Sequence, residues 1–321
     1  YENHKKYSID FYKNKKIGKR ADFYKFTQFV FEQMWQDLHS YANEKGIKII
    51  GDMPMYVSAS SCDVWADPEY FTVNENGEIE KEAGVPPDYF SKEGQRWGNP
   101  LYNWDKIKED NYSWWLKRLK RAISLYDFTR LDHFRGFEAY WSVPKGEKAI
   151  KGEWILGVGT EVFEKAYEEF GALPFIAEDL GTITPGVRAL LEKTGFLGAD
   201  VIQFYDKDPE NYIPPLNKIA YSGTHDNQTL RGWCIDRYFG GEENDENKKY
   251  IDEKIEILKD KLYSCRSNIV IMPLQDVLNL GDESRMNKPG TVDENWKWQA
   301  LKEQLEGYDE KLRNLTEKNN R

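Results

Sequence analysis

The segment 128–137, FTRLDHFRGF, carries four ionisable side chains within six positions: Arg130, Asp132, His133 and Arg135. Its apolar beginning predicts a short strand at 128–131. Because side chains alternate faces along a strand, Arg130 and Asp132 are expected to project the same way. A neighbouring guanidinium favours the ionised form of a carboxyl group. A fixed, ionised carboxylate is what a covalent nucleophile in glycosidic-bond chemistry requires. An ion-pair network at a strand end is the alternative for this segment alone.

A second carboxyl group, Glu178, follows the wholly apolar run 174–177. Apolar surroundings disfavour the charged form of a carboxyl group, and the neighbouring Asp179 adds a like charge, so both raise its pKa. A carboxyl group whose pKa lies near neutrality is suited to act as the general acid that protonates a leaving oxygen. The alternative for Glu178 alone is an acid that caps a helix or forms a salt bridge.

A third candidate, Asp226, lies in the polar segment 223–227, GTHDN, between His225 and Asn227. It could bind sugar hydroxyl groups and stabilise a positively charged transition state. The chain has four His, and two of them, His133 and His225, adjoin these acids. A structural hydrogen bond is the alternative for a His beside an Asp.

Strands that alternate with helices are expected to position these residues, and this alternation favours a parallel sheet that is buried on both faces. Six strands are predicted, at 47–50, 128–131, 174–177, 201–204, 219–221 and 269–272. An acidic residue follows closely on five of them: Asp52, Asp132, Glu178, Asp226 and Asp276. In a β/α barrel the active site lies at the carboxyl ends of the strands. Five acids gathered at that end therefore indicate function.

Helices are predicted from apolar residues at spacings of three and four. One stripe runs from Phe26 to Tyr41, with Gly46 as its cap, and a second runs from Trp115 to Tyr126. Further helices are expected at 161–170, 185–194 and 247–263, and the tail after Trp296 is helical and charged. The segment 56–104, rich in Gly, Pro and aromatic residues, is interpreted as a long insertion.

The composition excludes several classes of protein. The net charge of −10 argues against nucleic acid as the main partner. No apolar run is long enough to span a membrane, and residues 1–30 lack a signal-peptide pattern. Three scattered cysteines suit reduced thiols, so a cytoplasmic location is expected. No metal-binding or nucleotide-binding motif occurs, so neither a metal nor an organic cofactor is expected.

Taken together, eight segments resemble the 4-alpha-glucanotransferases, also called amylomaltases or disproportionating enzymes, which are relatives of the alpha-amylase barrel. They stand in the family's order over most of residues 20–300: GDMPMYV (51–57), DVWADPEYF (63–71), GVPPDYFSKEGQRWGNPLY (84–102), TRLDHFRGFEAYW (129–141), AEDLG (177–181), GTHDN (223–227), MPLQD (272–276) and RMNKPGT (285–291).

The resemblance implies a retaining transferase that moves alpha-1,4-glucan segments between maltooligosaccharides. It assigns Asp132 as nucleophile, Glu178 as acid/base and Asp226 as transition-state stabiliser. Substrate-binding residues carried over from the family are Arg130, His133, His225, Trp97 and Asn295. A hydrolase with the same acids and an inactive glucan-binding protein are the alternatives.

The resemblance also implies a (β/α)8 TIM-barrel fold, of which about six strands are present, with long inserted loops. The expected organisation is a polar N-terminal segment at 1–20, a partial catalytic barrel at 21–305 with the insertion 56–104, and a charged tail at 306–321. The family's long N-terminal part has no match here. We therefore expect a truncated chain, inactive alone, that a complementing N-terminal segment could complete. A second departure is Gln299, where the family usually has Arg.

Overall fold

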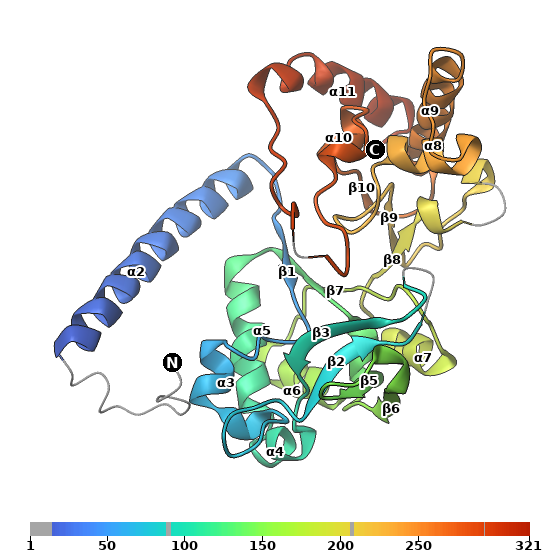
Figure 1. The fold of residues 1–321 in the computed structure, drawn as a ribbon. Helices are drawn as coiled ribbons and strands as arrows, with labels where there is room; N and C mark the ends of the chain where they lie inside the picture. The colour runs from blue at the N-terminus through green and yellow to red at the C-terminus, as the bar shows by residue number, and fades with distance from the viewer. Residues whose placement is uncertain (1–14, 88–90, 206–208, 292) are drawn as a thin grey trace. The chain divides into compact units, whose positions relative to one another are not determined.

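The computed structural model of the chain describes residues 15–87, 91–205, 209–291 and 293–321 (Figure 1). The chain divides into two compact units, Tyr1–Phe196 and Leu197–Arg321. Most of the predicted N-terminal segment, residues 1–14, and residues 88–90 of the predicted insertion lie outside the described residues. No helix in the described ranges is long and apolar enough to cross a membrane.

A three-stranded parallel sheet organises the first unit (Figure 1). Its order is β1 (Ile50–Met53), β4 (Phe128–Leu131) and β7 (Phe175–Ala177). The helices α5 (Ser113–Leu125) and α6 (Glu161–Phe170) precede β4 and β7, and α7 (Pro185–Thr194) follows. Each of these helices buries apolar residues spaced three or four apart, such as Trp115, Leu119 and Ala122 of α5. The predicted helix boundaries at Gly171 and at Thr184 and Gly195 are confirmed.

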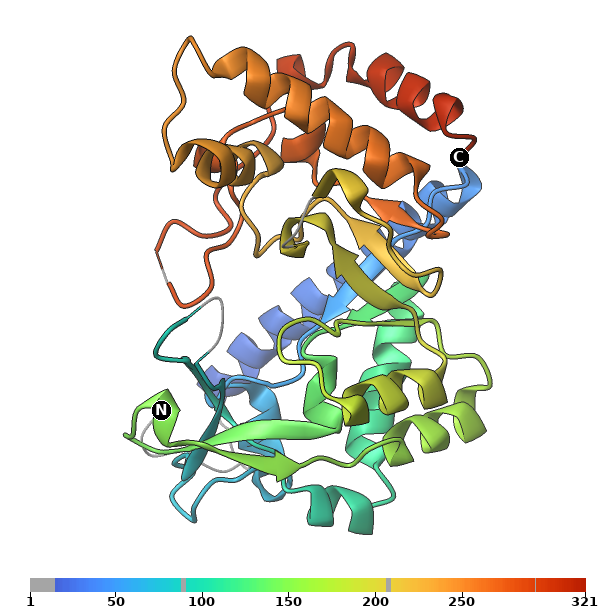
Figure 2. The same ribbon diagram turned by 90° about the vertical axis from the view of Figure 1, so that its right-hand side faces the viewer.

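An antiparallel sheet of four strands, in the order β3-β2-β5-β6, adds to the first unit (Figures 1 and 2). Its strands are β2 (Lys81–Val85), β3 (Gln95–Pro100), β5 (Ala139–Pro144) and β6 (Glu153–Leu156). None of the four strands was predicted: β2 and β3 lie in the segment 56–104, interpreted as a long insertion, and β5 and β6 follow β4. They are short, and Gly84 takes part in both strand pairings of β2, so the segment shows no simple alternation of polar and apolar residues.

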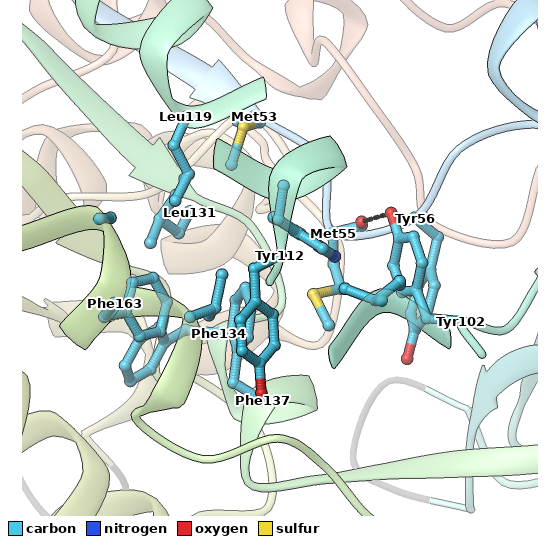
Figure 3. Packing of buried hydrophobic residues seen from close by; sticks show 14 of the residues in the cluster. Met53, Met55, Tyr56, Tyr102, Tyr112, Leu119, Leu131, Phe134, Phe137 and Phe163 are labelled. Atoms are coloured by element: carbon cyan, nitrogen blue, oxygen red, sulfur yellow. Dashed lines mark hydrogen bonds between the residues drawn. The ribbon is translucent and has the colours of Figure 1, made fainter. Parts of the chain in front are cut away.

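Aromatic side chains fill much of the core of the first unit (Figure 3). Phe134, Phe137 and Phe163 pack together, with ring centroids 4.7 Å apart for Phe137 and Phe163. Tyr56 stacks on Tyr102, whose hydroxyl group donates to the Met55 carbonyl oxygen at 2.7 Å. This packing fixes the chain directly after β1 and β4, which is where polar residues cluster.

The long helix α2 (Lys15–Glu44) leads to β1 and confirms the helix predicted from the stripe beginning at Phe26. One side of it contacts the end of α5, because Trp35 Nε1 donates to the Leu125 carbonyl oxygen at 2.8 Å. The predicted apolar stripe is nevertheless largely uncovered: Phe26, Met34, Leu38 and Tyr41 are each 53–67% exposed. Among the described residues, this helix therefore carries a large uncovered apolar face.

The second unit has its own parallel sheet, in the order β10-β9-β8 (Figure 1). The strands are β8 (Gly198–Val201), β9 (Lys218–Tyr221) and β10 (Val270–Ile271). Its helices are α8 (Leu230–Phe239), α9 (Lys248–Ser264), α10 (Leu274–Val277) and α11 (Tyr308–Lys318). Leu230, Ile251, Ile255 and Leu258 are among the buried residues that join α8 and α9 into one core.

Shorter elements complete the chain. They are α3 (Cys62–Ala66), α4 (Trp104–Glu109) and the 3₁₀ helices at Pro68–Tyr70, Phe134–Phe137, Ala149–Lys151, Ile202–Phe204, Pro209–Asn211, Asp282–Ser284 and Lys302–Leu305.

All six predicted parallel strands are present, but two are displaced along the chain. The first begins at Ile50 rather than Ile47, because the Asp127 side chain accepts the Ile49 N–H at 2.9 Å and holds that residue outside the sheet. The fourth ends at Val201, because the chain then turns and the Gln203 side chain donates to the Ser222 carbonyl oxygen. The prediction placed all six in one barrel, whereas the structure has them as two sheets of three.

Candidate active site

Arg130 occupies the centre of a charged cluster at the carboxyl end of the first parallel sheet. It lies on the middle strand β4 and is paired in register with Asp52 of β1. Its Nη1 lies 2.7 Å from both Asp52 oxygens, and its Nη2 lies 3.0 Å from Asp132 Oδ1. Burial lowers the pKa of the Arg130 guanidinium. The negative charges of Asp132 and Asp52 have the larger combined effect, so the pKa lies above its usual range. The predicted same-face placement of Arg130 and Asp132 is confirmed.

A tight turn after β4 presents Asp132 and the residues behind it. The Asp132 backbone N–H donates to the Met53 carbonyl oxygen at 3.0 Å, which ties the turn to β1. His133 then adopts the left-handed conformation, with φ 47°, before the 3₁₀ turn at Phe134–Phe137. A left-handed His is uncommon and is held here by the surrounding contacts. Asp132 consequently stands at the strand end with its side chain 39% exposed.

Glu178 approaches the same cluster from β7. Its backbone N–H donates to the Leu131 carbonyl oxygen at 3.0 Å. Its carboxyl oxygens accept the His133 N–H at 2.9 Å and the Leu180 N–H at 3.1 Å. Burial raises the pKa of Glu178 to about 8, and the negative charge of Asp132 contributes, against the lowering effect of Arg130 and the two N–H groups. The predicted rise is confirmed, but the like charge that contributes to it is Asp132, where the sequence indicated Asp179.

The site therefore holds two carboxyl groups in unequal environments. Asp132 is in contact with a permanent cation, whereas Glu178 binds its proton up to about neutral pH. Two carboxyl groups whose proton affinities are pushed apart can divide the roles of anion and acid between them. This arrangement can support nucleophilic attack together with proton donation.

Aromatic rings border the charged cluster. Trp97, on strand β3, lies edge to face with the His133 ring, with centroids 4.8 Å apart, and the Tyr56 ring is 6.2 Å from both. Burial, with the positive charge of Arg135, lowers the pKa of His133 to about 3, so this ring is neutral. Trp97 belongs to the segment 56–104 that the sequence indicated as a long insertion. The structure places it on a strand, with its indole N–H donating to the Gln95 side chain at 3.2 Å.

Two predicted residues of the second unit, His225 and Asp226, lie in the loop after β9, and the third, Asn295, lies in the segment 293–296 much later in the chain. Asp226 Oδ2 lies 3.5 Å from His225 Nε2, and the His225 ring lies 5.1 Å from the Trp296 ring. Asn295 lines a cavity of about 730 Å³. Its side chain also organises the loop, because it accepts the Lys288 N–H and donates to the Thr291 carbonyl oxygen, both at 3.0 Å. His225 and Asp226 are therefore in contact with each other, whereas the side-chain hydrogen bonds of Asn295 are made to Lys288 and Thr291.

Asp52 and Asn287 were not predicted as site residues. Asp52 had a signal in the sequence, as an acid close to a strand end, but its pairing with Arg130 depends on the strand register. Asn287 donates to Asp226 Oδ1 at 2.6 Å across 61 positions of sequence. Its signal in the sequence was its place in RMNKPGT (285–291), one of the segments that carry the family resemblance, but nothing local indicates its contact with Asp226. Asp276, also at a strand end, is buried and accepts the Ser222 hydroxyl and the Leu230 N–H, which is a structural role.

No group of three or more His, Cys, Asp or Glu side chains is arranged to hold a metal ion in the part of the chain that the structure describes. The cysteines are unpaired, with Cys62 exposed, Cys234 buried and Cys265 between these extremes.

Comparisons with known proteins agree on one family. A family model described as 4-alpha-glucanotransferase matches residues 2–303. A 4-alpha-glucanotransferase of Aquifex aeolicus is 45% identical over 295 residues, which are 88% of this chain and 60% of that protein. One of Clostridium butyricum is 43% identical over 311 residues, covering 90% of this chain and 63% of that protein. The chain thus spans about three fifths of the length of these relatives.

A solved structure is also similar: the amylomaltase of Streptococcus agalactiae in complex with acarbose. It matches with a TM-score of 0.87 and 39% identity, over 96% of this chain and 64% of that one.

Proposed function

The chain belongs to the 4-alpha-glucanotransferase family, and we propose that it carries the catalytic residues of a retaining enzyme that transfers alpha-1,4-glucan segments. The donor is an alpha-1,4-glucan or maltooligosaccharide, and the acceptor is a second maltooligosaccharide or glucose. No metal or organic cofactor takes part in the proposed reaction.

The reaction proceeds by double displacement. Asp132 attacks the anomeric carbon while Glu178 donates its proton to the departing glycosidic oxygen, so one carbon–oxygen bond forms as another breaks. The product is a glycosyl ester on Asp132. Glu178, now ionised, takes the proton from a 4-hydroxyl group of the acceptor, whose oxygen attacks the same carbon and releases Asp132. Two inversions give net retention. Asp226 stabilises the positive charge that develops on the sugar ring.

The observation that carries this proposal is the contrast between the two carboxyl groups of the first unit. Arg130 contacts Asp132 at 3.0 Å, which supports an anionic nucleophile. The pKa of Glu178, raised to about 8, supports an acid that is protonated at neutral pH. One turn positions both groups, because Asp132 is followed directly by His133, whose N–H binds the Glu178 carboxyl group at 2.9 Å.

Five further residues are proposed to bind sugar. Arg130 and the neutral His133 lie beside the bond that is cut, and Trp97 offers an aromatic face on the acceptor side. His225 also lies beside the bond that is cut, and Asn295 binds the donor sugar. The neutral state of His133 supports its proposed role in sugar binding. A neutral imidazole has one nitrogen that donates and one that accepts, and it can remain uncharged in a partly buried site while it binds a sugar hydroxyl group.

We further propose that the parallel strands belong to one eight-stranded β/α barrel of the alpha-amylase kind, in the cytoplasm. A complementing N-terminal polypeptide supplies the remaining strands. The exposed apolar face of α2 supports this, since soluble proteins rarely leave such a patch uncovered. Phe23, Phe29 and Phe31 on this helix are also 51–62% exposed.

Incubation with maltotriose tests the activity. Transfer gives longer oligosaccharides together with glucose, whereas hydrolysis gives only glucose and maltose. The assay is run on the chain alone and after addition of the polypeptide that corresponds to the N-terminal two fifths of a relative. Activity that needs the added polypeptide supports the complementing segment. Glucose and maltose as the only products in both assays would contradict transfer, and unchanged maltotriose would contradict catalysis.

A further inference from the structure

Residues 285–291 and 293–296, called the bracket below, hold the loop that carries Asp226. Arg285 Nη2 donates to the Asp226 carbonyl oxygen at 2.7 Å, and the Asn287 backbone N–H donates to the His225 carbonyl oxygen at 3.0 Å. The bracket is itself closed, because the Trp296 N–H donates to the Met286 carbonyl oxygen at 2.6 Å. Two residues of the bracket, Arg285 and Asn287, thus contact the backbone of the loop.

One contact of the bracket reaches the carboxylate instead of the backbone. The side-chain amide of Asn287 donates to Asp226 Oδ1 at 2.6 Å. A hydrogen bond of this length to a charged acceptor is short and strong. A carboxylate only accepts, so the Asn287 amide presents its NH2 group to it. The other oxygen, Oδ2, is left on the side of His225.

The loop does not depend on this side chain for its fold. Gln203 Nε2 donates to the carbonyl oxygens of Ser222 and Gln228 at 2.9 and 3.0 Å, at the two ends of the loop. Asp282 accepts the Thr229 N–H at 2.9 Å, where α8 begins. Within the loop, Asn227 Oδ1 accepts from the Thr224 N–H at 2.9 Å. These contacts fix the backbone on both sides of Asp226.

We propose that Asn287 is a positioning residue for the carboxylate of Asp226. Its amide stops rotation of the carboxyl group and directs Oδ2 toward the sugar ring. The inference rests on the proposed function, because it assumes that Asp226 stabilises the transition state. A carboxylate that is already oriented needs no rearrangement when charge develops, which is the origin of electrostatic catalysis. Asn287 touches neither the nucleophile nor the acid, so it acts through Asp226.

A double-mutant cycle tests this coupling by maltotriose turnover, measured in the presence of the added N-terminal polypeptide. Asn287→Ala is expected to lower kcat about 10- to 100-fold, as a misplaced catalytic group does, with KM changed by less than about twofold. In the Asp226→Asn background, Asn287→Ala is expected to cost less than about twofold, since residues that act as a unit are not additive. Asn244→Ala is the matched control, because it also removes a side-chain amide, but one whose oxygen accepts only the Glu246 and Asn247 N–H groups of its own loop. It is expected to leave kcat unchanged.

An isosteric variant separates positioning from loop structure. Asn287→Asp keeps the size and the backbone contacts of the residue but sets a second carboxylate against Asp226. If Asn287 only supports the structure of the loop, kcat should fall less in Asn287→Asp than in Asn287→Ala. The proposed role predicts the opposite order, because like charges in contact repel. Thermal unfolding of each variant confirms that it is folded, and Asn287→Ser replaces any variant that is not.

A binding measurement extends the test to a protein without turnover. Deoxynojirimycin, a cationic mimic of the charged sugar ring, is expected to bind at least tenfold more weakly to Asn287→Ala, while maltotriose binds equally to both. Full additivity in the cycle, equal loss of both ligands, or failure of the mimic to bind the unsubstituted protein overturns the proposal. Unchanged kcat in Asp226→Asn overturns the proposed role of Asp226 instead, so the two failures are distinguishable.

Discussion

Arg130 and Asp52 lie directly opposite each other on the neighbouring parallel strands β4 and β1, and both oxygens of Asp52 are 2.7 Å from Arg130 Nη1. The guanidinium is thus held from one side by Asp52 while its other end contacts Asp132 at 3.0 Å. A planar guanidinium held at two points is a rigid group. Asp52 therefore determines where the positive charge beside the proposed nucleophile lies.

Replacement of Asp52 by Asn is expected to lower kcat for maltotriose transfer about 10- to 100-fold, because Arg130 loses its charged anchor and shifts relative to Asp132. The control is Glu153→Gln, which breaks an exposed ion pair with Lys81 far along the antiparallel sheet. Exposed pairs contribute little, so Glu153→Gln should leave kcat unchanged. Equal activities of the two variants would contradict a positioning role for Asp52.

Replacement of Asp132 by Asn is expected to abolish turnover in the active protein, by several orders of magnitude, because no covalent intermediate can form. The fold should persist, since the Asp132 side chain is 39% exposed and the turn is held by its backbone N–H. Circular dichroism and maltotriose turnover measure the two effects. Retention of more than about a tenth of the activity would rule out Asp132 as the nucleophile.

The pH dependence of kcat/KM should report the proton on Glu178. Its pKa is raised to about 8, so the carboxyl group is protonated below that pH and loses its proton as the pH rises through it. A general acid works only while protonated, so activity should fall above about pH 8. The charge of Asp132 contributes to this pKa, and Asp132→Asn should therefore lower it. Infrared titration of the carboxyl band in the two proteins checks this, and an unchanged pKa would contradict the coupling.

Replacement of Trp97 by Ala is expected to reduce transfer more than total bond cleavage. The ring lies 4.8 Å from His133 and is proposed to carry the acceptor sugar, so without it water competes better for the intermediate. The ratio of longer oligosaccharides to glucose measures the effect. Trp104→Phe is the control, a change within the core where the Trp104 ring stacks on Trp115. Equal loss of transfer and hydrolysis in Trp97→Ala would indicate that the ring only anchors the strand.

The order of helices and strands was largely predictable from the sequence. Helices such as Glu161–Phe170 and Pro185–Thr194 carry their own signals, in apolar residues spaced three and four apart and in the residues at their ends. The shared face of Arg130 and Asp132 follows from the alternation along one strand. The raised pKa of Glu178 follows from the apolar residues Phe175–Ala177 before it. Each of these inferences depends on residues that are close in sequence.

Tertiary structure alone decided the contacts between distant segments. The register of β1 against β4 selects Asp52 as the partner of Arg130, 78 positions away, and the antiparallel strand β3 brings Trp97 to His133. Asn287 reaches Asp226 only through the path of the bracket. The apolar stripe of α2 looks in sequence like a core face, yet it is exposed in this unit. Periodicity reports which side of an element is apolar, whereas strand register and packing decide what that side meets.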